Sequence, residues 1–142
     1  MPDLEVLENP KTSLASEVIS SDGKTLGKYY FNDNRTPVTF DELPTHLVDA
    51  LIATEDIRFY SHSGIDFKRT FGAALKLGKD GGGSTITQQL AKLLFTGEGS
   101  RDILERLTQK FKEYIIAVRL ERHYTKDEII TQYLNLYDFG NN

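Results

Sequence analysis

The stretch from Leu51 to Lys92 begins with LIATEDIRFYSHSGIDF and ends with GGGSTITQQLAK. In its first part, an apolar pattern with helical spacing ends at the acidic pair Glu55 and Asp56. In its last part, a run of glycines leads into a second helical pattern. We expect this order to place one acid opposite a polar helix face, with the rest of the chain supporting the two helices.

The composition is that of one globular domain or a large piece of one. The chain has 142 residues, of which 39% are hydrophobic and 27% are charged, and its formal net charge is −4. These values exclude a disordered chain and a membrane-embedded one, and they give no support for nucleic-acid binding. Cysteine is absent, which excludes disulfides, thiolate metal sites and a cysteine nucleophile.

The sequence as it stands contains no pattern typical of a signal peptide or a membrane-spanning helix. The first residues, MPDLEVLENP, are acidic and lack an apolar region. The apolar runs are only a few residues long, whereas a spanning helix needs roughly 18 to 20. The last residues, LYDFGNN, directly follow an amphipathic pattern. We therefore expect a soluble chain that is truncated at its C-terminal end and continues in its parent protein.

Hydrophobic spacing predicts a mainly α-helical fold with a small β-hairpin arm at the N-terminus. The dipeptide Asp22-Gly23 favours a tight turn, which predicts a hairpin over about residues 15–31. A first helix is expected from near Pro44, because proline suits a first helical position. We expect residues 1–40 to form a lead-in and hairpin linker, and residues 41–142 to form the helical domain. The predicted buried face of the first helix is Leu47, Val48, Leu51 and Ile52.

Four further helices are predicted from caps and apolar rows. Asp66, Thr85 and Thr125 each precede an apolar row and are expected to cap a helix. A long helix is expected between the last two caps, from Asp102 to about Arg122. The predicted buried faces, in chain order, are Phe67, Phe71, Ala74 and Leu75; Ile86, Leu90, Leu93 and Leu94; Ile103, Leu107, Phe111, Tyr114, Ile115 and Val118; and Ile129, Ile130, Tyr133, Leu134 and Tyr137.

Glu55 is the first candidate for chemistry. It follows Ile52 by three residues and Leu51 by four, so it continues the apolar stripe of its helix. A carboxyl group partly removed from water in this way is suited to proton transfer. The alternative is that Glu55 ends the helix and extends into solvent. Position alone leaves both interpretations open.

A second acid and the histidines are weaker candidates. Glu113 has Lys110 one turn before it, and spacing alone favours a solvated helix pair. His62 could act as a base, although a single loop histidine more often holds a loop by hydrogen bonds. The three histidines, which include His46 and His123, are too scattered to predict a metal site.

The glycine run can be tested against a phosphate-binding loop. It fails that test, because Ser84 stands where the loop requires lysine. A glycine-rich turn before a helix still exposes N–H groups that favour an anion. Thr85, Gln89 and Lys92 have the spacing of one polar helix face, which could add a cation to the same groove. A flexible connector before an ordinary helix is the equally supported alternative.

Four segments resemble the motifs of the family 51 glycosyltransferases, the peptidoglycan polymerase domains of class A penicillin-binding proteins. EDIRFYSHSG (Glu55–Gly64) is similar to the first motif, and GGGSTITQQLAK (Gly81–Lys92) is similar to the second almost letter for letter. QKFKE (Gln109–Glu113) resembles the third motif, and KDEIITQYLNLYDFG (Lys126–Gly140) the fourth. The motifs stand in the family's order, and the resemblance as a whole covers about residues 15–142.

The resemblance implies a lysozyme-like helical domain that polymerises lipid II into glycan strands. The donor would be a polyprenyl-pyrophosphate-linked chain, and the reaction would invert the anomeric carbon. The implied location is the bacterial cell envelope, at the outer (periplasmic) face of the cytoplasmic membrane, with the anchor helix absent from this chain. The implied partners are lipid II, the nascent glycan strand, the membrane surface and a C-terminal transpeptidase domain, with no nucleic acid. The resemblance implies no nucleotide sugar and no definite cofactor, and it leaves room for a divalent cation, Mg²⁺ or Mn²⁺.

The resemblance also implies roles for individual residues. Glu55 would be the general base that takes the proton from the acceptor sugar's 4-hydroxyl. Glu113 and Lys110 would support the leaving group, directly or through a divalent ion. The implied substrate-binding residues are Asp56, Phe59, His62, Thr85, Gln89, Lys92 and Lys110.

The chain departs from the family pattern at three points. Gln109 stands where the third motif usually begins with arginine, and Asp138 stands where the fourth commonly has an aromatic residue. The fifth motif is absent from the sequence. Two alternatives to a glycosyltransferase are a lysozyme-like muramidase with Glu55 as acid and a non-catalytic module that binds lipid-linked precursor. The polar row with Lys92 argues against the muramidase, because polymeric glycan carries no pyrophosphate.

Overall fold

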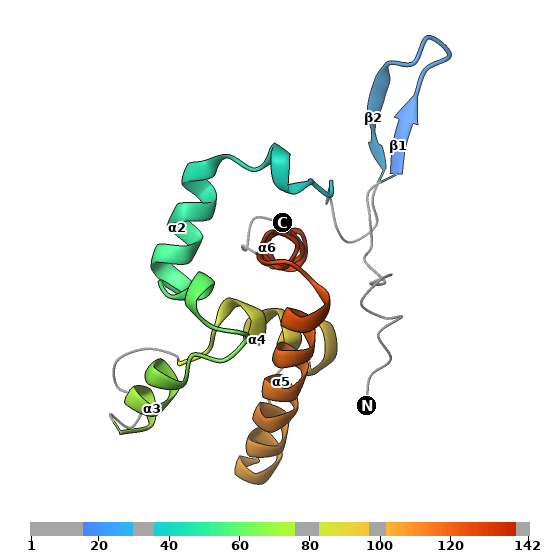
Figure 1. Cartoon of the computed structure of the whole chain (residues 1–142). Helices are drawn as coiled ribbons and strands as arrows, with labels where there is room; N and C mark the ends of the chain where they lie inside the picture. Colours follow the sequence, from blue (N-terminus) through green and yellow to red (C-terminus); the bar gives the residue numbers. More distant parts are fainter. Residues whose placement is uncertain (1–15, 30–35, 76–82, 97–101, 139–142) are drawn as a thin grey trace.

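The structure is a computed structural model that describes residues 16–29, 36–75, 83–96 and 102–138. The described elements are the strands β1 (Ser16–Ile19) and β2 (Thr25–Tyr29), the short helices η1 (Phe40–Glu42) and η2 (Phe59–Ser61), the π-helical turn η3 (Lys92–Thr96), and the α-helices α2 (Thr45–Glu55), α3 (Phe67–Leu75), α4 (Ile86–Ala91), α5 (Ile103–His123) and α6 (Lys126–Leu136). The predicted mainly α-helical fold with an N-terminal hairpin is therefore confirmed (Figure 1). The proposed division at residue 40 stays a prediction.

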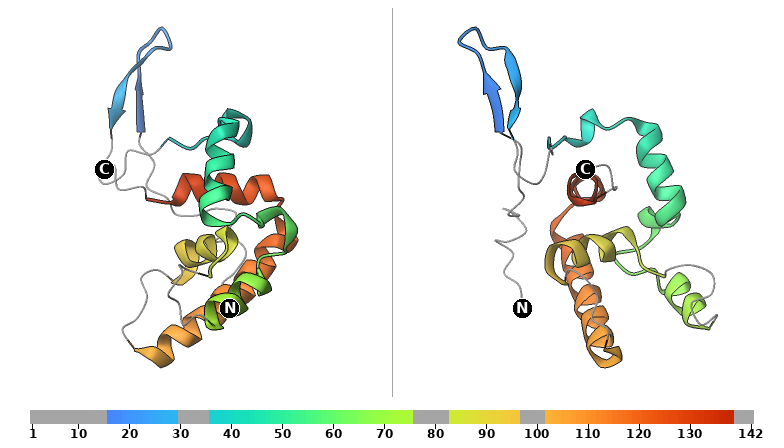
Figure 2. Two further views of the ribbon diagram at one scale, coloured as in Figure 1. Left: turned by 90° about the vertical axis from the view of Figure 1, so that its left-hand side faces the viewer. Right: turned by 180° about the vertical axis from the view of Figure 1, so that it is seen from behind.

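The hairpin stands apart from the helices (Figures 1 and 2). Its strands are antiparallel, with Ser16 opposite Tyr29, and the register shifts between Val18 and Ile19. Every residue of both strands is exposed. Gly23 has a φ of 81°, which the predicted tight turn at this dipeptide requires. The arm is therefore built from local turn chemistry and buries little apolar surface.

Side-chain caps begin the helices near the positions that the sequence predicts. The Asp66 carboxylate accepts the N–H of Arg69 at 3.0 Å, and the Thr85 hydroxyl accepts the N–H of Gln88 at 3.1 Å. Thr125 forms a reciprocal capping box at the start of α6. Asp102 caps α5, and Pro44 is the cap of α2 rather than its first residue. Helix starts are readable from sequence because a cap acts within three residues.

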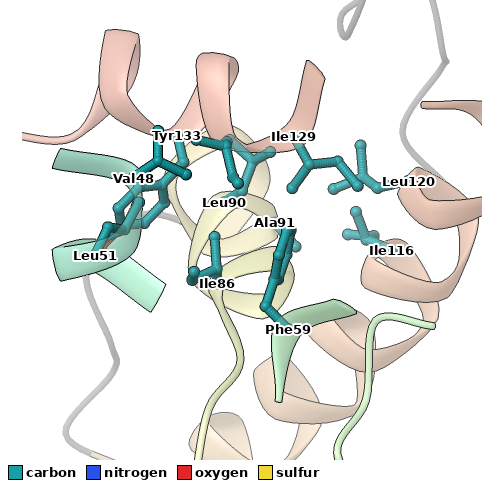
Figure 3. Close-up of a cluster of buried hydrophobic side chains, with 11 residues drawn as sticks. Val48, Leu51, Phe59, Ile86, Leu90, Ala91, Ile116, Leu120, Ile129 and Tyr133 are labelled. Carbon is teal, nitrogen blue, oxygen red and sulfur yellow. The ribbon is translucent and has the colours of Figure 1, made fainter. Parts of the chain in front are cut away.

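The core is centred on α4, which packs against α5 and α6. Its residues come from α2, η2, α4, α5 and α6 and are drawn in Figure 3. The buried members are Val48, Leu51, Phe59, Ile86, Leu90, Ala91, Ile116, Leu120, Ile129, Ile130 and Tyr133. Helix α4 is unusual because Thr87 and Gln88 are buried along with its apolar residues. A six-residue helix so enclosed needs partners for its polar groups as well as its apolar ones.

Two of the predicted buried faces are wrong. On α5, Ile103, Leu107 and Phe111 are exposed, and the buried row is the one that contains Glu113 and Ile116. The apolar row of α3 is also exposed at Phe67 and Phe71, and single residues on other helices deviate in the same way, namely Leu47 and Leu93. Periodicity finds an apolar row, but a helix with two such rows can turn either one toward the core.

Gly64 is where the loop after η2 touches the backbone of α5. Its φ is 88°, and a Cβ there would lie 2.8 Å from the carbonyl carbon and oxygen of Ala117. Gly23 has a similar φ, but a Cβ there would meet nothing within 4 Å. The two glycines therefore separate backbone strain from steric overlap.

We expect Gly64→Ala to lower the free energy of unfolding by about 2–5 kcal/mol, since strain and overpacking add. Gly23→Ala should cost only about 1–2 kcal/mol, the penalty of a left-handed backbone conformation. Urea unfolding followed by circular dichroism measures both. Equal losses in the two variants would contradict the close packing of Gly64 on α5.

Candidate active site

The buried carboxylate of Asp56 joins the end of α2 to the start of α4. One of its oxygens accepts the backbone N–H of Ile86 at 3.2 Å and lies 3.0 Å from Nε2 of His62. An ionised carboxylate only accepts hydrogen bonds, so as a hydrogen bond to one this contact requires a proton on Nε2 of His62. Asp56 is 1% exposed. Asp56 therefore joins the two helices. Through His62 it also holds the loop that follows α2, residues 56–66, which we call the motif loop.

Glu55 is brought against α4, as the sequence analysis expected. Nε2 of Gln89 donates to Oε2 of Glu55 at 2.7 Å, and the hydroxyl of Tyr133 donates to Oε1 of Gln89 at 3.0 Å. The side chain of Arg69 donates to the backbone carbonyl of Glu55. Glu55 is partly buried rather than extended into solvent. Gln89 was predicted to lie here, but Tyr133 was predicted only as a core residue.

The predicted polar row on the third helix is only partly present. Thr85 is fully buried, and its hydroxyl donates to the carbonyl of Gly64 at 2.7 Å. Gln89 is half-buried against Glu55, whereas Lys92 is exposed at the point where the π-helical turn begins. The row fails to form one surface because Thr85 packs inward as a cap. The glycines at 81 and 82 lie outside the described residues.

Glu113 is buried, so the expectation of a solvated pair is wrong. Its side chain is 7% exposed, and its Oε2 lies 2.8 Å from the ammonium of Lys110. Lys110 also donates to the hydroxyl of Ser84 at 2.7 Å and lies over the ring of Tyr114. Helix α5 thereby contacts the residue just before the N-terminal cap of α4, Ser84. The sequence signal for Ser84 was its place just before a helix cap.

A second, partly buried ion pair supports the motif loop around His62. Lys126 donates to the backbone carbonyl of His62 at 2.7 Å and pairs with Glu121 at 2.8 Å. Its ammonium lies 4.2 Å from the centre of the Phe59 ring, and Thr87 donates to Glu121 at 2.6 Å. Phe59 is fully buried beneath this group. Sequence reasoning missed Glu121 and Lys126, because no spacing rule connects residues on two different helices.

The loop is also held at its far end. Nε and Nη2 of Arg58 both donate to one oxygen of Asp66 at 2.7 Å. The Arg58 guanidinium, together with the backbone N–H of Arg69, holds the pKa of Asp66 below its ordinary value of 3.8. Asp66 therefore serves both as the cap of α3 and as the anchor of Arg58.

The described residues do not form a metal site of their own. Across those ranges, no group of three acidic or histidine side chains is arranged to hold a cation. The buried carboxylate of Glu113 already faces the Lys110 ammonium. A shallow hollow of about 260 Å³ adjoins Lys110 and is lined by Ile103, Arg106 and Leu107 as well. None of the described helices is long and apolar enough to cross a membrane.

The structure is thus a mainly α-helical body in which Glu55, at the end of α2, lies beside Gln89 of the short helix α4. A family model described as transglycosylase matches residues 22–142, and the chain belongs to this family. The motif resemblance is thereby confirmed.

The relatives are penicillin-binding proteins. Penicillin-binding protein 1A of Escherichia coli (strain K12) is 41% identical over 99% of this chain and 16% of its own length. Penicillin-binding protein 1F of Bacillus subtilis (strain 168) is 42% identical over 89% of the chain and 17% of its own length. Penicillin-binding protein 1A/1B of the same organism is 41% identical over 92% and 14%. The chain thus spans about one sixth of the length of these relatives.

The lowered pKa of Asp66 predicts an acid-sensitive contribution to stability. Because the folded pKa lies below the unfolded value of 3.8, this contribution is present above 3.8 and is lost as pH falls further through the folded value. We expect the stability difference between the wild type and Asp66→Asn to be constant from about pH 5 to 7 and to shrink below about pH 4. Urea unfolding at each pH measures it. A difference independent of pH down to complete protonation would exclude this role.

Breaking the Lys126–Glu121 pair should lower the free energy of unfolding more than breaking an exposed ion pair does. Lys126→Met leaves the Glu121 carboxylate buried without its cation, and we expect a loss of about 2–4 kcal/mol because Lys126 is itself partly exposed. Adding Glu121→Gln should recover part of this loss by removing the uncompensated charge. Lys24→Met, which breaks an exposed pair with Asp22, should change stability by less than about 1 kcal/mol. Equal losses of unfolding free energy in Lys126→Met and Lys24→Met, measured by chemical unfolding, would refute the stabilising role of the Lys126–Glu121 pair.

Proposed function

We propose that this chain is the glycosyltransferase part of a bacterial cell-wall polymerase, with lipid II as its substrate. The observation that carries this is the Glu55 carboxylate, held at the end of α2 by Gln89 of α4. Family membership and the penicillin-binding relatives support a transferase over a muramidase or a non-catalytic module.

In this proposal, Glu55 is the general base. Its carboxylate would take the proton of the acceptor sugar's 4-hydroxyl as that oxygen attacks the donor's anomeric carbon. The bond from this carbon to the lipid pyrophosphate would break on the opposite face, which inverts the configuration. Inverting transfer needs one carboxylate as base, with the hydroxyl in the place that water has in a hydrolase.

The leaving pyrophosphate needs cations where negative charge develops. Lys110 is the first candidate, because Glu113 and Ser84 hold its ammonium in place. Arg106 lines the same hollow as Lys110 and is one turn before Gln109, which takes the place of the usual motif arginine. Lys92 is the third cation in our proposal. The apolar side chains beside Arg106 would suit a lipid-linked anion.

The remaining motif residues are proposed to shape the site rather than to react. Asp56 and His62 tie the loop to α4, and Phe59 anchors it in the core. Thr85 is proposed to act by placing the start of α4, since its hydroxyl is engaged by Gly64. No step is assigned to a divalent ion, because the described side chains do not offer a fitting set of ligands. The proposed location remains the outer face of the cytoplasmic membrane, next to a transpeptidase domain.

The decisive variant is Glu55→Gln in the full-length protein, incubated with lipid II and followed by sizing of the glycan products. We expect polymerisation to fall by about 10²–10⁴-fold, since the amide cannot accept the proton. Asp49→Asn is the matched control, because it neutralises an exposed acid on the same helix. Long strands made by Glu55→Gln would exclude the assigned base. Shortening of preformed glycan by the wild type would favour the muramidase.

A further inference from the structure

The hydroxyl of Tyr133 is the last donor in a chain of hydrogen bonds that ends on Glu55. It donates to Oε1 of Gln89 at 3.0 Å, and Nε2 of Gln89 donates to Oε2 of Glu55 at 2.7 Å. The three side chains come from α6, α4 and α2 in turn. Tyr133 is 1% exposed, so its hydroxyl reaches the half-buried Gln89 from within the protein core.

A glutamine amide can face a carboxylate in two ways, and only one of them is attractive. With its NH₂ group toward Glu55, the amide donates a charge-assisted hydrogen bond. Turned by 180°, it would present its carbonyl oxygen to a negative charge. The Glu55 carboxylate, which only accepts, favours the first orientation, and the Tyr133 hydroxyl supports it by donating to the amide oxygen on the other side.

The surroundings of Tyr133 keep it in this role. Its ring belongs to the buried cluster that includes Val48 and Leu90 (Figure 3). The ring also stacks on Tyr137, with ring centres 5.0 Å apart. Burial, followed by the nearby Glu55 charge, raises the pKa of the Tyr133 hydroxyl above its ordinary value of 10.0. The hydroxyl thus stays protonated and remains a donor throughout the neutral pH range.

We propose that Tyr133 is a positioning residue for the catalytic carboxylate: it locks the Gln89 amide, which in turn fixes the direction of Glu55. With Oε2 engaged by Gln89, the carboxylate keeps acceptor capacity for the hydroxyl of the incoming sugar. A base free to rotate would spend less time in the productive geometry, and kcat would fall. This role of Tyr133 rests on the transferase function proposed above.

The test begins with Tyr133→Phe, which keeps the ring and its packing but removes the hydroxyl. With lipid II as substrate, we expect kcat to fall about 3- to 10-fold, the effect of one hydrogen bond, while KM stays within about twofold. Tyr29→Phe, in the exposed hairpin, is the control that removes a remote hydroxyl. Wild-type kcat in Tyr133→Phe would overturn the role of Tyr133.

A double-mutant cycle distinguishes positioning through Gln89 from a general loss of packing. In a Gln89→Leu background the amide is gone, so adding Tyr133→Phe should change kcat by less than about twofold. Independent, additive losses would overturn the proposal. Each variant is assayed well below its own thermal unfolding midpoint, so that a change in stability does not enter kcat.

The outcomes also separate this inference from the function on which it rests. If Glu55→Gln still polymerises lipid II, the assigned base is wrong and Tyr133 has no catalytic group to position. If Glu55→Gln is inactive while the cycle shows no coupling between Tyr133 and Gln89, the transferase function stands and only the positioning role fails.

Discussion

The buried Asp56 carboxylate is the interaction on which the rest of this structure depends. It accepts hydrogen bonds from the first N–H of α4 and from His62, and so it fixes the end of α2 against the start of α4. Because a buried carboxylate without such partners would be costly, the two helix ends and the loop adopt this arrangement together. Glu55, its neighbour in sequence, is thereby placed beside Gln89 rather than in solvent.

Polar groups as well as apolar ones hold the short helix α4 in the core. Thr87 reaches Glu121 of α5, and the side chains of Thr85 and Gln88 both donate to the carbonyl of Gly64. Six residues of helix have little stability alone, so tertiary contacts must supply it. A short helix held by α5, α6 and the Gly64 carbonyl is a rigid platform, and such a platform suits a carboxylate whose direction matters.

Local rules predicted the parts of the fold that depend on near neighbours in sequence. The caps Asp66, Thr85, Asp102 and Thr125 were found because a cap acts within one turn of its helix. The hairpin turn at Gly23 was found for the same reason. The buried face of α5 was predicted wrongly, because that helix has an exposed apolar row as well as the buried one. Which row is covered depends on packing against another helix, α4, which local spacing within α5 does not show.

The candidate site also has features that the sequence predicted and features that only the structure revealed. The sequence by itself determined the family, the acid Glu55 at the end of an apolar helix, and the capped polar helix that follows the glycine run. Only the tertiary structure decided that Glu113 is buried and that Gln89 donates to Glu55. It also placed the Tyr133 hydroxyl where it donates to Gln89. Motifs record which residues are present, whereas hydrogen bonds between α2, α4 and α6 form only once burial has removed the competing water.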